Sequence, residues 1–414
     1  MQDNLREIAR TCFDAGVRAA DPYRAVADIL SDRPEPRCKR LIFVALGKAA
    51  VPMMRAALHW QTPDQAVLVT NPENAAEIDG FTCLVGDHPV PSARGELAAA
   101  EVEKLLHQAG KDDDILLLLS GGASALVPAP KPPLTLADKM FINEQMLKAE
   151  MPIEHINTVR RSLSRIKGGG FLKMAAPAKV EALILSDVPS NDPRFIASGP
   201  TLPRTSDEDA AQILRDYGLY DSLASQMQRA LAEPIDLDVP AGHNHIIGSN
   251  SKSVRAMMAA APKGYKTRIK SKPITGNVEE VASYFADLVS KAPTDAAMYL
   301  SGGEPTVDVT GDGLGGRNQE LALRVANLLD GVDRPWVFLS GGTDGRDGPT
   351  DAAGAIVDNG SLDRITSSSL DLQSELENNN SFAVLEASGD LLTTGGTGTN
   401  VADLHVLILG PANS

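Results

Sequence analysis

The feature that most constrains the fold is a series of short strand-like runs, most of them largely apolar, separated by longer stretches with helical periodicity. The runs occupy residues 41–46, 66–70, 115–120, 181–186, 243–250, 296–303, 335–342 and 404–410. Runs of this length, bounded by Gly, Pro, Asp or Ser, are typical of strands buried on both faces of a sheet. Between them, three- and four-residue spacings mark apolar helical faces, as with Leu5, Ile8 and Cys12. The alternation predicts an α/β fold with largely parallel sheets.

The length and one connector suggest how this alternation is divided. A chain of 414 residues is long enough for more than one domain. A Pro-punctuated stretch, "LAEPIDLDVPAG", follows residue 230, and the strand–helix rhythm restarts after it. We therefore expect an α/β domain over residues 1–235 and a second over residues 236–414, with the last strand packing on one or the other.

Composition excludes some classes of partner. The net charge of -15 argues against a nucleic-acid partner or an anionic membrane surface, because both require clustered Lys and Arg. The three cysteines form no C-x-x-C pair, which suits a reducing compartment and gives no zinc pattern. No apolar run approaches the roughly 18 residues of a membrane helix, and the first residues are unlike a targeting peptide. We expect a cytoplasmic protein; whether it forms a homo-oligomer stays open.

The tripeptide Ser-Gly-Gly follows a predicted strand three times, within residues 116–126, 298–307 and 337–345. Glycines at a strand end allow a tight turn with exposed backbone N–H groups, and ligands of α/β proteins bind at the carboxyl ends of strands. Three such loops could converge on one cleft. The alternative is that they are ordinary turns of this fold class.

Two basic stretches are candidates for binding anions. Lys48 comes directly after a strand and at the start of a helical run, where its charge opposes the helix dipole unless an anion joins it. Within residues 154–170, a helix over residues 156–167 would place Asn157, Arg160 and Lys167 on one face, where Arg forks could hold a carboxylate or phosphate. The alternatives are an exposed lysine beside a turn and a solvated helix face.

Acidic residues follow other strands. Asp187 lies just past residues 181–186 and could bind a metal, accept a hydroxyl proton or cap a helix. Glu304 follows the strand at 296–303. Arg317 opens a helix after Gly315 and Gly316, and the N–H groups there, with Arg317, predict an anion site. A hairpin turn and a helix cap explain the same residues.

Two metal or nucleotide patterns are weaker. The stretch "GGTDGRDGPTDAAG" fails the EF-hand spacing, but Asp344, Asp347 and Asp351 could hold Mg²⁺ with phosphates and waters completing its shell, and Asp344 is the favoured residue. Gly311, Gly313 and Gly316 give a literal G-x-G-x-x-G before a helix. A dinucleotide site would want an acid at the end of the next strand, and none is there.

Taken together, the chain resembles the glycerate 2-kinase family (class II glycerate kinases, MOFRL-type). The motifs that carry the resemblance are "GKAA", "HPVP", "SGGASAL", "NTVRRSLSRIKGGG", "LSDV", "ASGPT", "SGGEPTV", "GGRNQELAL", "TDGRDGPTDAAGA" and "TGTNVADLHVLILG". The resemblance implies a Rossmann-like N-terminal domain, an active site in the interdomain cleft, and ATP with Mg²⁺ or another divalent cation as cofactors. It also implies phosphorylation of D-glycerate at the 2-hydroxyl to give 2-phosphoglycerate and ADP.

The resemblance also implies roles for individual residues, which we carry over as expectations. The catalytic set is Lys48, Asp187 and Arg317, and the substrate set is His88, Asn157, Arg160 and Lys167. The nucleotide or phosphate set is Ser120, Gly121, Gly122, Ala123, Ser124, Gly302, Gly303, Gly315 and Gly316, and the metal set is Glu304 and Asp344. The alternatives are an NAD(P)H-dependent hydroxypyruvate reductase and a non-catalytic protein that binds a nucleotide or a sugar acid.

Overall fold

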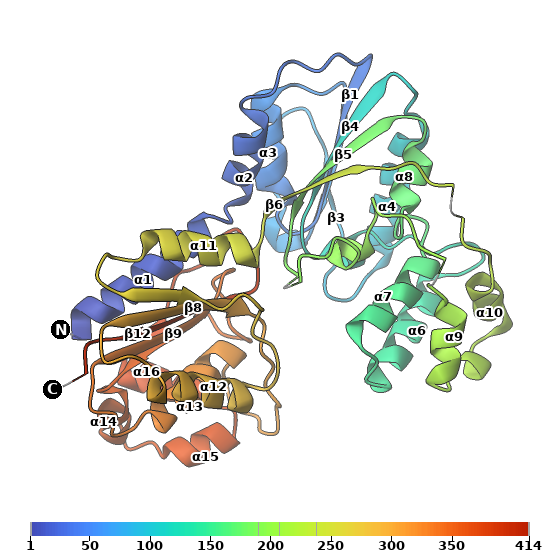
Figure 1. The fold of residues 1–414 in the computed structure, drawn as a ribbon. Helices are drawn as coiled ribbons and strands as arrows, with labels where there is room; N and C mark the ends of the chain where they lie inside the picture. Colours follow the sequence, from blue (N-terminus) through green and yellow to red (C-terminus); the bar gives the residue numbers. More distant parts are fainter. Residues whose placement is uncertain (1, 189, 207, 237, 413–414) are drawn as a thin grey trace. The chain divides into compact units, whose positions relative to one another are not determined.

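The protein forms two compact units, each built around a six-stranded sheet (Figure 1). The structure is a computed structural model and describes residues 2–188, 190–206, 208–236 and 238–412. Unit 1 comprises Met1–Asp21, Asp187–Ser190 and Gly248–Ser414, and unit 2 comprises Pro22–Ser186 and Asn191–Ile247. Among the described residues, no helix is both long and apolar enough to cross a membrane.

The sheet of unit 2 has the strand order β3-β2-β1-β4-β5-β6. Its strands are β1 (Arg40–Leu46), β2 (Gln65–Thr70), β3 (Cys83–Val85), β4 (Asp113–Leu119), β5 (Lys179–Leu185) and β6 (His243–Gly248). The pairings from β3 through β5 are parallel, with Ile42 opposite both Gln65 and Ile115. This is the strand order of a Rossmann-type sheet, so the prediction of a Rossmann-like domain is confirmed. The order reverses between β1 and β4, where such sheets bind ligands at the carboxyl ends of the strands.

Helices cover this sheet and also form a cluster of their own. The helices of unit 2 are α2 (Pro22–Leu30), α3 (Ala50–Trp60), η1 (Pro72–Asn74), α4 (Ala93–His107), α5 (Ala123–Leu126), α6 (Leu136–Lys148), α7 (Ile153–Ser162), α8 (Gly170–Ala175), η2 (Ile196–Ser198), α9 (Ala210–Asp216), η3 (Tyr220–Ser222) and α10 (Ser225–Leu231). Helices α6, α7, α9 and α10 pack around a separate apolar core that includes Ile142, Val159, Leu214 and Met227. A capping box between Thr135 and Asp138 begins α6.

The sheet of unit 1 has the order β11-β10-β9-β12-β8-β7 and is mixed. Its strands are β7 (Lys266–Ile269), β8 (Ala297–Gly303), β9 (Trp336–Gly342), β10 (Gly354–Asp358), β11 (Leu391–Leu392) and β12 (Asp403–Leu409). The last strand, β12, lies between β8 and β9 and runs antiparallel to both. The prediction of largely parallel sheets is therefore wrong for this unit. A strand buried on both faces has the same apolar pattern in a parallel and an antiparallel sheet, so the local pattern does not reveal its direction.

Helices cover both faces of this second sheet (Figure 1). They are α1 (Gln2–Arg18), α11 (Asn250–Ala260), α12 (Val278–Ser290), α13 (Arg317–Leu328), α14 (Ser361–Thr366), α15 (Leu372–Glu377) and α16 (Ser381–Ser388). One core holds Leu5 and Phe13 of α1 with Val254 of α11 and Val406 of β12. The other holds residues of α12, α13 and α16 with Leu407 of β12, because successive strand residues face opposite sides.

The compact units divide the chain differently from the boundary expected at residue 235. Helix α1 belongs to unit 1, because its apolar stripe of Leu5, Ala9 and Phe13 is buried in the core of that unit. Residues 243–247, read from sequence as the first strand of the C-terminal domain, form most of β6 at the edge of the unit 2 sheet. Local periodicity predicts a strand or helix but not the core that accepts it.

Candidate active-site residues

In unit 2, the loops that follow β1 and β4 hold each other at the point where the strand order reverses. The Lys48 N–H donates to the Gly121 carbonyl at 2.9 Å, and the Ala49 N–H donates to the Ser120 hydroxyl at 3.0 Å. Gly47 has φ +125°, and a Cβ there would lie 2.3 Å from the Ser120 Oγ, so this close approach requires glycine. The turn places Lys48 at the carboxyl end of β1, just before α3.

The side chains of Lys48 and His88 both lie close to Gly122. A Cβ built on Gly122 would lie 3.1 Å from Cγ of Lys48 and 3.2 Å from Cδ2 of His88. His88 lies on an exposed loop, but local desolvation and the Lys48 charge lower the pKa of its imidazole to about 4, with Glu73 opposing the shift. His88 is therefore neutral near pH 7 and able to donate or accept one hydrogen bond beside the Lys48 ammonium.

A second group of expected residues reaches the same loop through hydrogen bonds. The Lys167 ammonium donates to the Ser124 carbonyl at 3.2 Å and also to the Ser124 hydroxyl. The Ser124 and Ser198 hydroxyls lie 3.4 Å apart, and Ser198 donates to Asn157 Oδ1 at 3.1 Å. The prediction that Lys167 shares a helical face with Asn157 is wrong, because α7 ends at Ser162. Lys167 instead reaches Ser124 from the turns after the helix.

Arg160 and an unexpected lysine complete the basic residues of this region. Arg160 donates from Nε to Asn143 Oδ1 of α6 at 2.9 Å. Lys139, one helical turn before Asn143, is only 8% exposed. Sequence reasoning missed Lys139, although a signal was present. Lys139, Ile142 and Met146 are the buried residues of α6 and have the spacing of an apolar stripe, in which a lysine is unusual.

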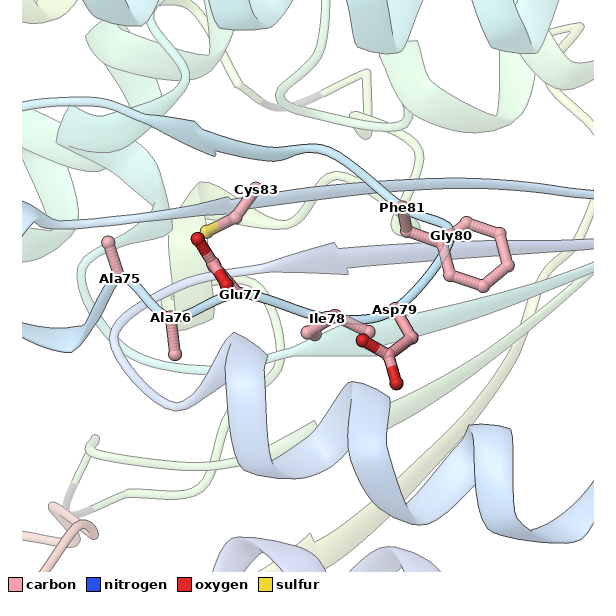
Figure 2. A pocket seen from close by; sticks show the side chains of 8 residues that line it. All are labelled: Ala75, Ala76, Glu77, Ile78, Asp79, Gly80, Phe81 and Cys83. Carbon is pink, nitrogen blue, oxygen red and sulfur yellow. The ribbon is translucent and has the colours of Figure 1, made fainter.

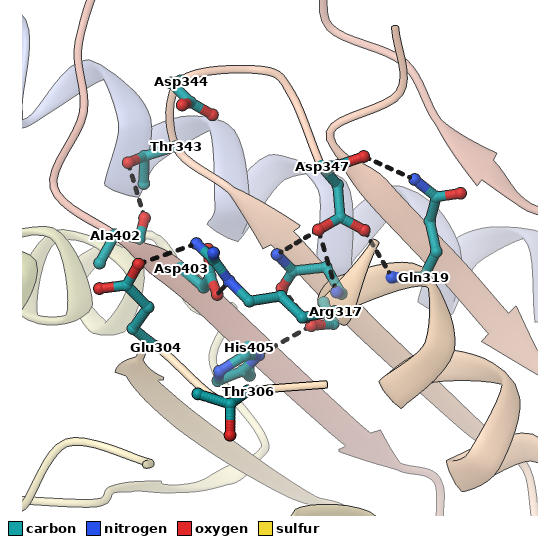
Figure 3. Close-up of polar contacts among 12 residues, drawn as sticks. Glu304, Thr306, Arg317, Gln319, Thr343, Asp344, Asp347, Ala402, Asp403 and His405 are labelled. Atoms are coloured by element: carbon teal, nitrogen blue, oxygen red, sulfur yellow. Dashed lines mark hydrogen bonds and ion pairs between the residues drawn. The ribbon is translucent and has the colours of Figure 1, made fainter. Parts of the chain in front are cut away.

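In unit 1, Arg317 at the start of α13 forms the centre of a charged group (Figure 3). Its guanidinium donates to both carboxylate oxygens of Asp403, at 2.6 and 2.9 Å, and lies 3.4 Å from Glu304. Burial opposes the Arg317 charge, but the ion pairs with Asp403 and Glu304 more than offset it and raise the pKa of the guanidinium. Asp403 is fully buried at the start of β12 and fixes the guanidinium plane bidentately. Sequence reasoning missed Asp403, although a signal was present: it is a carboxylate directly before the apolar run at residues 404–410.

Glu304 lies among other carboxylates. Burial raises its pKa, and the nearby charges of Asp403, Asp187 and Asp344 add to that rise, while Arg317 opposes it. The structure therefore brings Asp187, Glu304, Arg317 and Asp344 into one electrostatic group. No set of three or more His, Cys, Asp or Glu side chains with metal-binding spacing occurs among the described residues. Carboxylate oxygens are nevertheless the donors that Mg²⁺ uses, usually one or two with phosphates and waters.

The N-terminus of α13 is capped by a carboxylate of the protein itself. Asp347 accepts from the backbone N–H groups of Asn318 at 3.1 Å and Gln319 at 2.8 Å (Figure 3). A Cβ on Gly316 would lie 2.3 Å from the Asp347 carboxyl carbon. Burial raises the pKa of Asp347 to about 6, against the hydrogen bonds from these N–H groups. The two amides that could bind phosphate beside Gly315 and Gly316 are therefore already used.

Four other glycines that the sequence suggests for nucleotide binding, at positions 302, 303, 311 and 313, permit close packing within unit 1. A Cβ on Gly302 would lie 2.0 Å from the Asn250 side chain, and one on Gly303 would lie 1.9 Å from the Ile274 carbonyl. Both glycines also pair with β12 inside the sheet. In the G-x-G-x-x-G pattern, Gly311 and Gly313 each lie against the Asn378 carbonyl, 2.5 Å from a Cβ at either position. These glycines give the backbone room beside other protein atoms.

Three buried polar side chains, Asn318, Ser340 and His405, form a chain of polar contacts within unit 1. The Ser340 hydroxyl donates to Asn318 Oδ1 at 2.6 Å and lies 3.0 Å from Nδ1 of His405. His405 is fully buried in β12, in register with Ser301 of β8 and Ser340 of β9. Burial lowers its pKa to about 4, with Asp403 opposing and Arg317 assisting. The serines of two Ser-Gly-Gly motifs therefore flank a neutral histidine inside the sheet.

A surface hollow elsewhere on unit 2 contains none of the expected residues (Figure 2). It lies along the segment that connects β2 to β3. Its lining consists of Ala75, Ala76, Glu77, Ile78, Asp79, Gly80, Phe81 and Cys83. This hollow has no cation for an anionic substrate, and the carboxyl ends of β1 and β4 stay the stronger candidate.

Comparisons with known proteins find relatives over nearly the whole chain. Residues 8–232 match the family described as a domain of unknown function, DUF4147, and residues 297–403 match the MOFRL family. The chain is 37% identical to a D-glycerate 2-kinase of Thermotoga maritima over 98% of both chains. It is also 37% identical to an Agrobacterium vitis protein provisionally named a hydroxypyruvate reductase, over 98% of this chain and 95% of that protein.

The fold has a close counterpart among solved structures. The crystal structure of a glycerate kinase from Thermotoga maritima matches with a TM-score of 0.90 and 35% identity. The match covers 98% of this chain and 100% of the other. The α/β architecture is thus shared over nearly the whole length.

Proposed function

Because the chain belongs to the glycerate 2-kinase family, we propose that it transfers the terminal phosphoryl group of ATP to the 2-hydroxyl of D-glycerate. The products are 2-phosphoglycerate and ADP. The observation that carries the proposal is the full-length similarity to a relative named D-glycerate 2-kinase. The position of Lys48 and the loop at residues 120–124, at the strand-order reversal of a Rossmann-type sheet, supports it independently.

Phosphoryl transfer depends mainly on positioning and on neutralising charge. We assign Lys48 and Arg317 to the negative charge of the transferring group. The bidentate pair with Asp403 restricts Arg317 to one orientation, which reduces the reorganisation needed when charge develops. His88, neutral beside Lys48, supplies a hydrogen bond to substrate without adding charge. The loop of Ser120, Gly121, Gly122, Ala123 and Ser124 is assigned to phosphate contacts.

The acidic residues have a different role. Asp187 orients the substrate hydroxyl and accepts its proton as the new O–P bond forms. The carboxylates of Glu304 and Asp344 fit Mg²⁺ as hard oxygen donors. Burial raises the pKa of Glu304, neighbouring negative charges add to the rise, and a bound cation would offset both effects. Bound there, Mg²⁺ would neutralise phosphate charge on ATP. Asp403 is committed to Arg317 and is not assigned to the metal.

The substrate carboxylate requires cations of its own. Arg160 and Lys167, with the Asn157–Ser198–Ser124 chain beside them, provide donors that suit a carboxylate. Arg160 retains donors beyond those it gives to Asn143, because a guanidinium has five. We assign Asn157, Arg160 and Lys167 to binding the hydroxy acid.

The reductase name of one relative gives the second candidate function. The only G-x-G-x-x-G pattern in the chain argues against it. Its glycines lie against Asn378 and Asp347, and Asp347 takes the helix N–H groups that a dinucleotide pyrophosphate would need. Incubation with hydroxypyruvate and NADH separates the candidates: the kinase leaves the nicotinamide absorbance unchanged, whereas a reductase bleaches it.

A coupled assay for ADP tests the proposal directly. With ATP, Mg²⁺ and D-glycerate, we expect ADP release that depends on D-glycerate, and a phosphoryl group on the 2-oxygen of the product. Removal of Mg²⁺ with a chelator should stop the release of ADP. ADP release that is equal without D-glycerate would contradict the proposal.

A further inference from the structure

Three cations of unit 2 lie close together with little acidic charge to balance them. Lys139 is 8% exposed, Lys167 is 4% exposed, and Arg160 is half-buried. Each of the two lysines feels the repulsion of Arg160, and Lys167 also feels that of Lys139. The acidic influence on Lys139 is that of Glu96, which is smaller than the repulsion from the neighbouring arginines. The region is therefore buried and positively charged.

The Lys139 ammonium is the most unusual of the three. Across the described parts of the chain, its Nζ has no hydrogen-bond partner, and it has no contact with solvent. Burying a cation without a partner is strongly unfavourable, because the charge loses its hydration and gains nothing in return. Burial, with repulsion from Arg160 and Arg165, lowers the pKa of Lys139 to about 8. Such a position is retained most easily when a ligand supplies the missing acceptor.

Within the described residues, the hydrogen-bond acceptors of the other two cations are uncharged. Arg160 donates to the Asn143 amide oxygen, and Lys167 donates to the carbonyl and hydroxyl of Ser124. Burial also lowers the pKa of both groups, for Lys167 with repulsion from Lys139 and Arg160. Lys139 and Asn143 are one turn apart on α6, so Asn143 fixes Arg160 on the helical face that carries Lys139.

We propose that Lys139 completes an oxyanion site with Arg160 and Lys167, and that this site takes a carboxylate or a phosphoryl group. Ammonium groups and a guanidinium fork are the donors that such anions accept most strongly. Naming the hydroxy-acid carboxylate as the ligand rests on the proposed function, whereas the oxyanion chemistry does not. Lys139 is then a ligand-binding residue, maintained at a cost to the stability of the ligand-free protein.

The test measures binding of two anions in the absence of ATP. D-Glycerate and inorganic phosphate are titrated calorimetrically into the full-length protein and its variants. Lys139→Met keeps the length of the side chain and removes its charge. We expect it to weaken binding of at least one anion by about tenfold or more, as loss of a charge-assisted hydrogen bond implies. We also expect its ligand-free melting temperature to exceed that of the wild type.

Two further variants sharpen the result. Lys139→Arg keeps the charge and should retain most of the affinity. Lys148→Met removes an exposed lysine at the far end of α6, where it pairs with Glu144 at 2.7 Å, and should change neither affinity nor melting temperature. A larger loss for D-glycerate identifies a carboxylate site, and a larger loss for phosphate identifies a phosphoryl site.

The inference is overturned if Lys139→Met binds both anions with wild-type affinity, whatever its melting temperature. It is also overturned if the wild type shows no saturable binding of either anion. Failure of the proposed function gives a different pattern. The wild type would then bind an anion in a Lys139-dependent manner but release no ADP with D-glycerate, and the oxyanion site would stand without the kinase assignment.

Discussion

Substitution of Asp403 by Asn tests whether the orientation of Arg317 matters for turnover. Asp403 is fully buried and accepts two charge-assisted hydrogen bonds from Arg317, at 2.6 and 2.9 Å. Asn keeps the volume and one acceptor oxygen, but it removes the negative charge and places an NH₂ group against a guanidinium donor. After the change, Glu304 at 3.4 Å is the remaining ion-pair partner of Arg317 within the described residues.

The magnitude follows from the type of bond that is lost. A hydrogen bond to a charged group is worth about 1.5–3 kcal/mol, and a neutral one about 0.5–1.5 kcal/mol. Replacing two of the first kind by one of the second implies a loss of roughly 1.5–5.5 kcal/mol before solvent is considered. The Arg317 side chain is 34% exposed, so screening reduces this to about 1–2 kcal/mol. At about 1.4 kcal/mol per tenfold, kcat should fall about tenfold if the loss applies to the transition state.

The assay measures kcat and KM for D-glycerate by ADP release, together with the melting temperature. Asp358→Asn is the matched control. Asp358 is also buried in the same sheet and pairs with Arg6 at 2.6 Å and Arg364 at 3.2 Å. We expect both variants to have a lower melting temperature than the wild type, but only Asp403→Asn to have a lower kcat. Wild-type turnover in Asp403→Asn, or an equal loss in both variants, would refute the positioning role of Asp403.

Three further predictions concern single residues. Lys48→Ala should lower kcat by about 100-fold or more with an unchanged circular dichroism spectrum, because it removes a cation assigned to the transferring phosphoryl group; near-normal turnover would remove Lys48 from the mechanism. Asp347→Ala leaves the N–H groups of Asn318 and Gln319 unpaired, so the free energy of unfolding in urea should fall by about 2 kcal/mol, and an unchanged midpoint would contradict the capping role. His405 has a pKa lowered to about 4 in the folded protein, so the unfolded chain takes up its proton first as the pH falls. The contribution of neutral His405 to the free energy of unfolding is therefore fully present above about pH 6.5. It falls by up to about 3 kcal/mol as the pH drops towards 4. Urea titrations across this range should show a smaller pH dependence in His405→Gln, and identical slopes would argue against a buried neutral histidine.

The parts of the fold that follow from local pattern were predictable. Apolar runs at 41–46 and 115–120 gave β1 and β4, and the glycines and polar residues after them gave the two loops that hold Lys48. Those loops meet because parallel strands present their carboxyl ends at one edge of the sheet. This geometry follows from the fold class, so the grouping of Lys48 with residues 120–124 could be expected from the sequence.

What failed depended on contacts distant in sequence. The direction of β12 was hidden because a strand buried on both faces has no polar alternation to read. The free amides expected at the start of α13 are occupied by Asp347, a residue 28 positions after Gln319. Asp403 and Lys139 acquire significance from the charges that the fold places around them. Residue type alone therefore identified many of the charged candidates but not the partners that determine their chemistry.

The central claim is that this chain phosphorylates D-glycerate at the 2-oxygen with ATP. The most direct measurement is ³¹P and ¹H NMR of the product formed from ATP, Mg²⁺ and D-glycerate, with ADP quantified in the same sample. We expect equal amounts of ADP and a single phosphomonoester whose phosphorus couples to the proton on carbon 2. A phosphoryl group on the oxygen of carbon 3 would contradict this function. So would the absence of a phosphomonoester together with oxidation of NADH by hydroxypyruvate.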